Sequence, residues 1–286
     1  FFGFLDDQED INSGLIVNDL DIGIGRVPAG DEQAAKNFVD KVLKYYSAAA
    51  MGPWRNNITF VADDEDQNLH LQDAELISAG AAATDPVLNQ EKIYLDAYQQ
   101  ESGSGGSRYP KVNQAISNGI LTGTLIWNFN GHGGANRLAE ETVLDQESVS
   151  SWKNSGRLPL FITATCDFAP YDNPLVRSIG EDLLLRSGTG AIALMTTTRV
   201  VFAFSNRIMN NNYLRSALQP DANGKYKSLG DAVRDAKNIT YQGSGDVSNN
   251  RKFTLLGDPA MTLAFPSLQV RTTKINGIAA GLPDTI

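Results

Sequence analysis

Two scarce residues could carry out nucleophilic chemistry in this sequence. Cys166 is the only cysteine among 286 residues and His132 is one of two histidines, and each directly follows a strongly apolar run, 160–165 and 124–130 respectively. A thiol attacks as its thiolate, and a neighbouring imidazole can take the thiol proton and later give it to a leaving group. The stretch between them leaves room for a crossover helix joining neighbouring parallel strands. The sequence therefore predicts both side chains at adjacent strand ends, where open α/β sheets bind ligands.

Each residue also has a plainer explanation. A lone cysteine ending an apolar strand is most often an inert core residue, and a histidine in a glycine turn is more often structural than catalytic. Glycines 131 and 133 flank the histidine, which would let a substrate backbone approach closely. The backbone N–H groups of Gly133 and Cys166 could then bind an oxyanion. Spacing alone leaves the catalytic and structural interpretations open.

Composition narrows the class of protein. With 42% hydrophobic and 20% charged residues, the chain is typical of a globular protein. Its net charge of −9 argues against partners such as nucleic acid or anionic membranes. A single cysteine excludes an internal disulfide and cysteine-rich zinc sites. The sequence shows neither a signal peptide nor a membrane-length apolar run, and it begins as if cut from a longer protein.

Strand-like and helix-like segments alternate along the chain. Apolar runs predict strands at 21–27, 58–62, 93–95, 124–130, 160–165, 190–196, 253–259 and 261–265. Helical patterns occupy a stretch that Asp31 caps, and then 71–83, 109–118, 179–186, 206–218 and 229–239. Residues 101–107 predict a flexible surface loop. This order predicts an α/β fold with a mainly parallel sheet flanked by helices.

Two motifs resemble those of a known family. Residues 128–134 and 161–168 resemble the histidine and cysteine motifs of the gingipain-type cysteine peptidases (family C25), which share a clan with caspases and legumains. Segments 21–28, 60–64 and 255–259 agree in the same order, so the resemblance covers roughly residues 1 to 265. Within the family, segments 61–70 and 166–172 are more similar to the PorU-type sortase branch than to secreted gingipains.

The resemblance implies a division into domains. It predicts a caspase-like subdomain A over residues 1–85 and a catalytic, caspase-like subdomain B over 86–266. Residues 268–275 alternate between apolar and polar types, as in a strand with one buried face. This alternation predicts the first strand of a separate, truncated β-domain over residues 267–286, and the resemblance implies that this domain is an immunoglobulin-like β-sandwich.

The resemblance also implies a function. A sortase of the type IX secretion system removes the C-terminal sorting domain of secreted cargo through a thioester, here on Cys166. It then transfers the cargo to anionic lipopolysaccharide at the outer membrane and cell surface of Bacteroidota, together with other components of that system. The resemblance implies that no cofactor is required. Two alternatives stay open: a secreted gingipain-like endopeptidase, and a non-catalytic scaffold of a secretion complex.

Site residues follow from the same resemblance. Cys166 is the expected nucleophile, His132 the general acid and base, and Gly133 an oxyanion donor together with the cysteine N–H. Family members place an acidic residue near the histidine, and Asp96 and Glu101 are candidates because they precede the histidine strand. For each of them, a solvated surface carboxylate is the more common role of such a residue.

Two further sets of residues are candidates for binding. Segment 196–202 falls where gingipains bind the residue before the scissile bond, and it contains no acidic residue. Arg199 would oppose a basic side chain there, whereas Val201 and Phe202 favour a small or apolar one. Oxygen-rich loop 63–68 could hold structural Ca²⁺ through Asp63, Asp64 and Asp66, or be a solvated acidic loop. His70, just beyond it, is expected to be structural.

Overall fold

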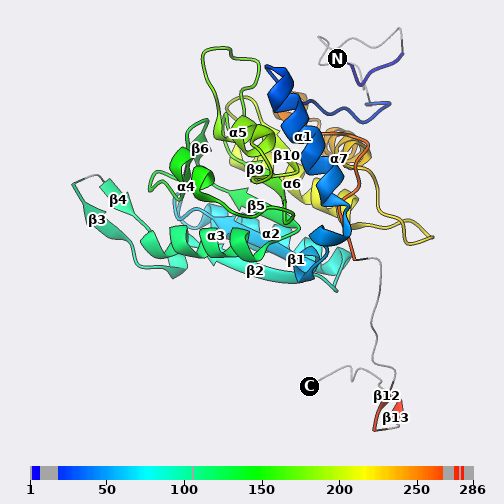
Figure 1. Ribbon diagram of the computed structural model, residues 1–286, viewed down its shortest axis with the longest axis horizontal. Coiled ribbons are helices and arrows are strands. Elements are labelled where there is room, and N and C mark those ends of the chain that lie inside the picture. Colours follow the sequence, from blue (N-terminus) through cyan, green and yellow to red (C-terminus); the bar gives the residue numbers. More distant parts are fainter. Residues whose placement is uncertain (1, 7–18, 105, 267–273, 277, 280–286) are drawn as a thin grey trace.

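A six-stranded sheet forms the centre of the computed structural model, which describes residues 2–6, 19–104, 106–266, 274–276 and 278–279 (Figure 1). The strand order is β11-β10-β9-β5-β1-β2, and only the β10–β11 pair is antiparallel. The strands are β1 Asn57–Ala62, β2 Asn89–Tyr94, β5 Ile126–Asn130, β9 Leu160–Ala164, β10 Ala193–Thr197 and β11 Phe253–Leu256. The predicted α/β fold with a mainly parallel sheet is confirmed.

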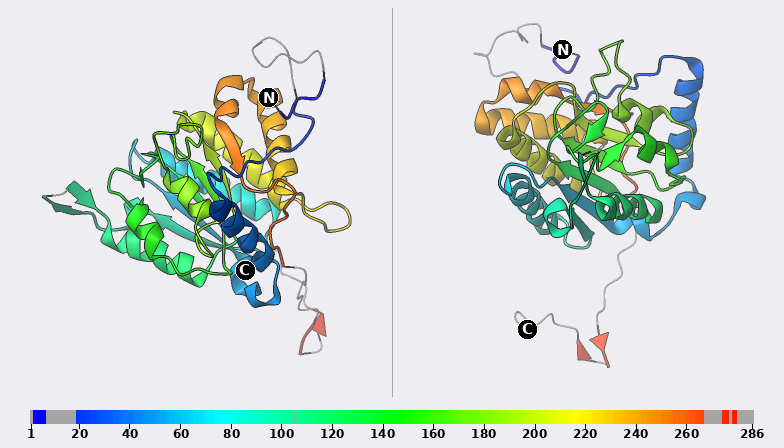
Figure 2. Two further views of the ribbon diagram at one scale, coloured as in Figure 1. Left: turned by 45° about the horizontal axis from the view of Figure 1, so that its top comes forward. Right: turned by 90° about the vertical axis from the view of Figure 1, so that its left-hand side faces the viewer.

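Helices cover both faces of this sheet (Figure 2). One face packs against α2 Leu69–Thr84, α6 Ala203–Leu218 and α7 Leu229–Ser244. The other packs against α1 Glu32–Tyr45, α3 Pro110–Thr122, α4 Gln146–Ser151 and α5 Ile179–Leu185. The shorter elements are η1 Ala48–Ala50, η2 Pro53–Asn56, η3 Leu95–Ala97, α8 Val247–Lys252, β3 Glu101–Gly103, β4 Gly106–Arg108, β6 Gly133–Gly134, β7 Arg137–Leu138, β8 Leu144–Asp145, β12 Lys274–Ile275 and β13 Ile278–Ala279.

The central strands are buried on both faces because each sends apolar side chains into both helical layers. In β5, Ile126 belongs to the core under α2 and α6, whereas Trp127 and Phe129 belong to the opposite core. The Trp127 ring stacks on Phe161 of β9 with ring centroids 4.3 Å apart. Continuous apolar runs of this kind are typical of parallel strands covered on both sides. Burial of these side chains on both faces specifies the register between β1, β5 and β9, and this register sets where the three strands end.

Several expectations differ from the structure. Residues 101–107 are not a loop throughout, because β3 and β4 pair there as an antiparallel hairpin. Residues 261–265 form no strand, and the 21–27 segment contributes only a bridge between Arg26 and Leu256. In the sheet, β1 of the expected subdomain A lies between β2 and β5 of the expected subdomain B, and the division into subdomains stays a prediction.

Most of the expected β-sandwich segment, 267–286, lies outside the described residues. Within it, β12 and β13 pair as a short antiparallel ladder between Lys274 and Ala279. An immunoglobulin-like domain therefore stays a prediction. Among the described helices, none combines the length and the hydropathy required to cross a membrane.

Candidate active site

The carboxyl ends of β1, β5 and β9 lie side by side. Ala62 is paired with Asn130, and Asn130 with Ala164, so these three strands end at the same level of the sheet. The next residues keep the register, since Asp63 N–H donates to the Asn130 carbonyl at 3.0 Å. His132 and Cys166 each stand two residues beyond a paired strand end. The expected adjacency of the two strands is present, although the connection carries β6, β7, β8 and the six-residue α4 instead of one long crossover helix.

The His132 imidazole is held by a carboxylate. Its Nε2 atom lies 2.9 Å from Oδ2 of Asp66, and both side chains are 49% exposed. The backbone N–H of His132 donates to Oδ2 of Asp63 at 2.8 Å, and its carbonyl accepts from Ala139 N–H at 2.9 Å. The hydrogen bond to His132 holds the pKa of Asp66 below its usual value. Backbone and ring of the histidine are thus both fixed by neighbouring groups.

An unusual turn carries Asp66. Asp66, Gln67 and Asn68 have φ values of 59°, 56° and 66°, and α2 begins at the next residue. The left-handed region costs a residue with a side chain roughly 1–2 kcal/mol. Three such residues in succession mark a backbone held by its surroundings, and strain of this kind concentrates at functional sites. Here the strained turn is the segment that brings Asp66 to the histidine.

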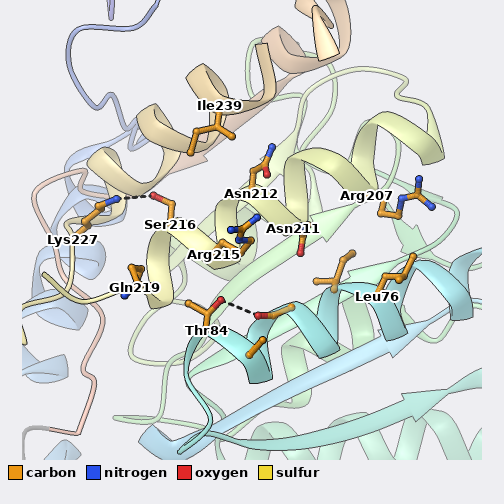
Figure 3. A pocket seen from close by; sticks show the side chains of 13 residues that line it. Leu76, Thr84, Arg207, Asn211, Asn212, Arg215, Ser216, Gln219, Lys227 and Ile239 are labelled. Atoms are coloured by element: carbon orange, nitrogen blue, oxygen red, sulfur yellow. Dashed lines mark hydrogen bonds between the residues drawn. The ribbon is translucent and has the colours of Figure 1, made fainter. Parts of the chain in front are cut away.

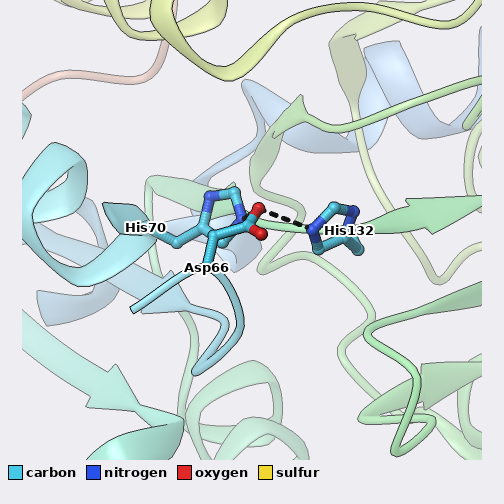
Figure 4. Close-up of side chains that lie close together, drawn as sticks. All are labelled: Asp66, His70 and His132. Carbon is cyan, nitrogen blue, oxygen red and sulfur yellow. Dashed lines mark hydrogen bonds and ion pairs between the residues drawn. The ribbon is translucent and has the colours of Figure 1, made fainter. Parts of the chain in front are cut away.

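The second histidine belongs to the same cluster. His70 lies in the first turn of α2, is 6% exposed, and its Nε2 atom is 3.3 Å from Oδ2 of Asp66. Its ring meets the His132 ring edge-on with centroids 5.1 Å apart, and Figure 4 shows Asp66 between the two rings. Burial lowers the pKa of His70, which favours the neutral ring.

Cys166 stands in a sharp turn at the end of β9. The following residue, Asp167, has a φ of 44°, and its N–H donates to the Arg199 carbonyl at 3.3 Å. The thiol is partly exposed, and its Sγ lies 3.6 Å from the Val201 carbonyl. One residue earlier, the Thr165 carbonyl accepts from the Thr197 hydroxyl. The end of β10 and the segment after it therefore hold the cysteine turn in place.

Gly133 brings the two motifs close together. A Cβ atom on this residue would lie 2.9 Å from both Thr165 Oγ1 and Leu138 Cδ2, so only glycine fits against the cysteine strand without displacing them. A pocket of about 420 Å³ opens here, lined by residues 132–137, 139 and 140. His132 and the backbone of Gly133 therefore both line this pocket.

The two acidic residues expected to orient His132 are exposed and stand on other elements than the loop that contacts its ring. Asp96 is exposed in η3, and Glu101 is exposed in β3, opposite Arg108 of the hairpin. Among the described residues, the carboxylate hydrogen-bonded to the His132 ring belongs to Asp66, which the sequence pointed to only as a metal ligand. The contact between Asp66 and His132 has a topological cause, because β1 is a direct neighbour of β5 and the loop after β1 reaches the histidine.

The expected substrate-binding residues differ in accessibility. Arg199 is exposed but forms a two-pronged ion pair with Asp172, with Nη2 2.6 Å from Oδ2. The Val201 side chain is buried in the core, so only its carbonyl reaches the site. Phe202 is 66% exposed, with the Lys252 ammonium 5.3 Å from its ring centroid. Asp172 is thus an acidic residue close to this segment, but its carboxylate is already paired with Arg199.

The expected metal ligands fall into two groups. Asp63, Asp64 and Glu141 bring oxygen atoms within 4.8 Å of one another, while Asp66 joins the two histidines instead. Burial raises the pKa of Asp63 to about 7, opposed by the hydrogen bond from His132 N–H. Asp64 Oδ1 and Glu141 Oε2 are buried and have no hydrogen-bond partner among the described residues. No sequence pattern points to Glu141 as a ligand, since it follows β7 in an ordinary polar stretch.

A second hollow lies away from the histidine and the cysteine. It measures about 780 Å³ and lies between α2, α6 and α7, as Figure 3 shows. Arg207, Arg215 and Lys227 contribute cations to its wall, and Arg207 is paired with Asp73 at 3.2 Å. None of the residues discussed above for the site around His132 lines it.

Comparisons with known proteins concern the family and the fold of the chain. The sequence pattern of "Peptidase family C25" matches residues 1–264. The crystal structure of the Arg-specific cysteine proteinase gingipain R (RGPB) is similar with a TM-score of 0.72 and 15% identity, covering 92% of this chain and 60% of that one. A complex of the pro- and mature domains of RgpB from Porphyromonas gingivalis gives 0.71 and 16%, covering 92% and 62%.

A third structure, described as a protease, has a TM-score of 0.63 with 14% identity over 82% of this chain and 54% of that one. At these identities the likeness concerns the fold. The chain spans about 60% of the first of these structures. No protein of curated function is similar enough to count as a relative.

Proposed function

Because the chain belongs to peptidase family C25, we propose that it cleaves peptide bonds through a thioester on Cys166, with His132 as general acid and base. One observation carries this proposal. The imidazole bound to Asp66 at 2.9 Å and the partly exposed thiol follow neighbouring strands at the same end of the sheet. A nucleophile, a proton carrier and a group that orients the carrier are the parts that nucleophilic catalysis needs.

The Asp66 contact supports one tautomer of His132 in this proposal. The lowered pKa keeps Asp66 ionised at neutral pH, and an ionised carboxylate only accepts hydrogen bonds. The Nε2 atom of His132 therefore carries a proton, which leaves Nδ1 to take the proton of the thiol. As the thiolate attacks the substrate carbonyl, the Nδ1 proton passes to the leaving amine and the C–N bond breaks. The N–H groups of Gly133 and Cys166 stabilise the oxyanion in this proposal, and one such donor typically contributes about 10²–10³ in kcat.

A sortase differs from a plain peptidase in the molecule that accepts the acyl group of the thioester, which is an amine instead of water. We place the chain in the PorU-type branch, on the resemblance of segments 61–70 and 166–172. The substrates would be secreted cargo proteins, which lose their C-terminal sorting domain. An amine of anionic lipopolysaccharide would then resolve the thioester at the cell surface, alongside other type IX secretion components. The immunoglobulin-like domain expected from residue 267 belongs to this proposal.

Replacing Cys166 by Ala in the full-length protein tests the sortase role. Cargo should keep its sorting domain, and no amine-linked product should form. Cargo that is still processed by the variant would refute the proposal. Hydrolysis products without any amine-linked product in the wild type would identify a secreted endopeptidase instead. A Cys166 thiol that alkylates no faster than a free thiol, with no change on His132→Ala, would identify the non-catalytic scaffold.

The residues around the Cys166 thiol support a preference for substrates with an apolar or small side chain before the scissile bond. The similar gingipain R is described as Arg-specific, but here Asp172 is neutralised by Arg199. Val200 and Phe202, both more than half exposed, follow Arg199 on the segment whose Val201 carbonyl contacts Sγ. We therefore propose that Phe202 contacts the substrate and that Arg199 disfavours a basic residue.

Structural Ca²⁺ is the remaining part of the proposal. Asp63, Asp64 and Glu141 fit a hard cation, since three carboxylates supply oxygen donors and two of their buried oxygens lack a hydrogen-bond partner among the described residues. Asp63 also accepts the His132 N–H, so a bound ion would support the backbone that carries the histidine. No catalytic step passes through this ion.

A further inference from the structure

Three side chains in the cluster around His132 form a ligand set of their own. Asp66, His70 and His132 each present a ligand atom, and these atoms all lie within 4.8 Å of one another (Figure 4). We propose that Asp66, His70 and His132 bind a Zn²⁺ ion, and that this ion reversibly switches the cysteine chemistry off. The inhibitory part rests on the function proposed above, whereas the binding site itself does not.

The distances suit zinc. Four ligands at bond lengths of 2.0–2.2 Å in a tetrahedron stand about 3.4 Å from one another. Oδ2 of Asp66 lies 2.9 Å from Nε2 of His132 and 3.3 Å from Nε2 of His70. Small side-chain movements would therefore be enough to place an ion between the three atoms. The fourth position would be left to water, as in zinc sites with three protein ligands.

His70 supplies an independent reason to expect a ligand. This side chain is 6% exposed, and Nε2 has no hydrogen-bond partner among the described residues. Its contact with Oδ2 of Asp66, at 3.3 Å, is longer than the usual range of about 2.7–3.2 Å for an N–H···O hydrogen bond, so Asp66 satisfies this nitrogen only weakly. Buried polar atoms in folded proteins are nearly always satisfied. A metal bound to Nε2 would satisfy this atom.

The donor atoms select the kind of metal. Two imidazoles and one carboxylate suit Zn²⁺ and similar transition metals, whereas Ca²⁺ and Mg²⁺ prefer oxygen alone. The neighbouring group of Asp63, Asp64 and Glu141 offers only oxygen. The loop after β1 thus contributes to two sites of different chemistry, and Ca²⁺ should not compete with Zn²⁺ for the histidines.

Zinc at this position would remove the proton acceptor. A Zn–Nε2 bond uses the lone pair of that nitrogen, so the proton on Nε2 of a neutral His132 must move to Nδ1. With Nδ1 protonated and Nε2 bound to the metal, the ring has no lone pair left for the thiol proton. The metal also takes Asp66 away from the imidazole that this carboxylate would otherwise orient. Removing the ion restores the Nε2–H and the active tautomer.

The chain offers a direct test because it contains only two histidines. We would label histidine with ¹⁵N in the Cys166→Ala protein, which lacks the thiol as a competing ligand, and titrate Zn²⁺ in the presence of excess Ca²⁺. The ring signals of both histidines should shift together and saturate at one equivalent. A shift of only one histidine, or none with zinc in several-fold excess, would overturn the proposal.

Variants separate this site from inhibition through the thiol. His70→Ala in the Cys166→Ala background should weaken Zn²⁺ binding at least tenfold, whereas the nearby surface change Glu65→Gln should not. In the active enzyme, His70→Ala should raise the Zn²⁺ concentration for half-inhibition by a similar factor, measured against its own zinc-free rate. Unchanged sensitivity would place the inhibitory zinc on Cys166 and refute the proposal. An inactive wild-type enzyme would refute the proposed function, while the binding measurements would still decide the zinc site.

Discussion

Nε2 of His132 lies 2.9 Å from Oδ2 of Asp66, a residue 66 positions earlier in the chain. The contact exists because β1 and β5 are adjacent parallel strands, so that the turn after β1 faces the glycine-rich turn after β5. It joins a left-handed, strained segment to the histidine of the candidate site. The orientation of the imidazole therefore depends on the fold of an element remote in sequence.

Replacing Asp66 by Asn should reduce kcat/KM roughly 10²-fold with little loss of stability. The amide can present its NH₂ group to Nε2, which favours the tautomer with the proton on Nδ1 and removes the acceptor for the thiol proton. The Asp66 side chain is half-exposed, so the fold should tolerate the change. Steady-state kinetics in a chelator, with a thermal melt of the same sample, measure both effects.

The matched control is Asp96→Asn, which removes an exposed carboxylate in η3. This variant should keep at least half of the wild-type kcat/KM. If Asp96→Asn lost as much activity as Asp66→Asn, the assignment of Asp66 as the orienting residue would be wrong.

Replacing Arg199 by Ala should make the enzyme accept basic residues before the scissile bond. The change leaves the Asp172 carboxylate without its guanidinium partner, and a substrate Arg or Lys could then pair with it. We expect kcat/KM for such substrates to rise about three- to tenfold relative to apolar ones, since the pair is exposed and screened by water. The double variant Arg199→Ala/Asp172→Asn should lose the gain, and a peptide library measures both.

Sequence patterns predicted the elements better than the contacts between loops. Apolar runs and the Asp31 cap, whose side chain accepts from Ala34 N–H, locate the central strands and α1 because they reflect local propensity and burial. The adjacency of the His132 and Cys166 strands followed from their spacing. This is confirmed by the pairing of β5 with β9.

The partner of His132 could not be predicted in the same way. A parallel sheet can place β1 or β2 beside β5, and sequence order favours β2, which is nearer in the chain and pointed to Asp96. The observed order β5-β1-β2 instead brings Asp66 and His70 to the site. The sequence contains no signal for strand order, so the contact of Asp66 with His132 could not be predicted. The turn that carries Asp66 was not marked either, because its three left-handed residues include no glycine.

Calcium should raise the melting temperature of the wild-type protein by several degrees, and Glu141→Gln should abolish most of that rise. A ligand at 100 times its Kd contributes about 2.7 kcal/mol of stability to the state that binds it. Glu141 is buried, with Oε2 unpartnered among the described residues, so it would contribute directly to an ion. Thermal melts in Ca²⁺ and in EGTA measure the effect, with the exposed Glu140→Gln as control. Equal melting temperatures of the wild type in both buffers would contradict the site.

Asp63→Asn should flatten the dependence of stability on pH between about 4 and 7. Burial raises the pKa of Asp63 from 3.8 in the unfolded chain to about 7, so the folded state binds more protons in this window. Stability contributed by the protonated carboxyl is therefore present at pH 4 and is lost as the pH rises through 7, by on the order of a few kcal/mol. Asparagine keeps an oxygen for the His132 N–H but cannot ionise. Urea unfolding in EGTA at pH 4.5 and 7.5 compares the two proteins, and parallel losses of stability would show that Asp63 does not titrate in this range.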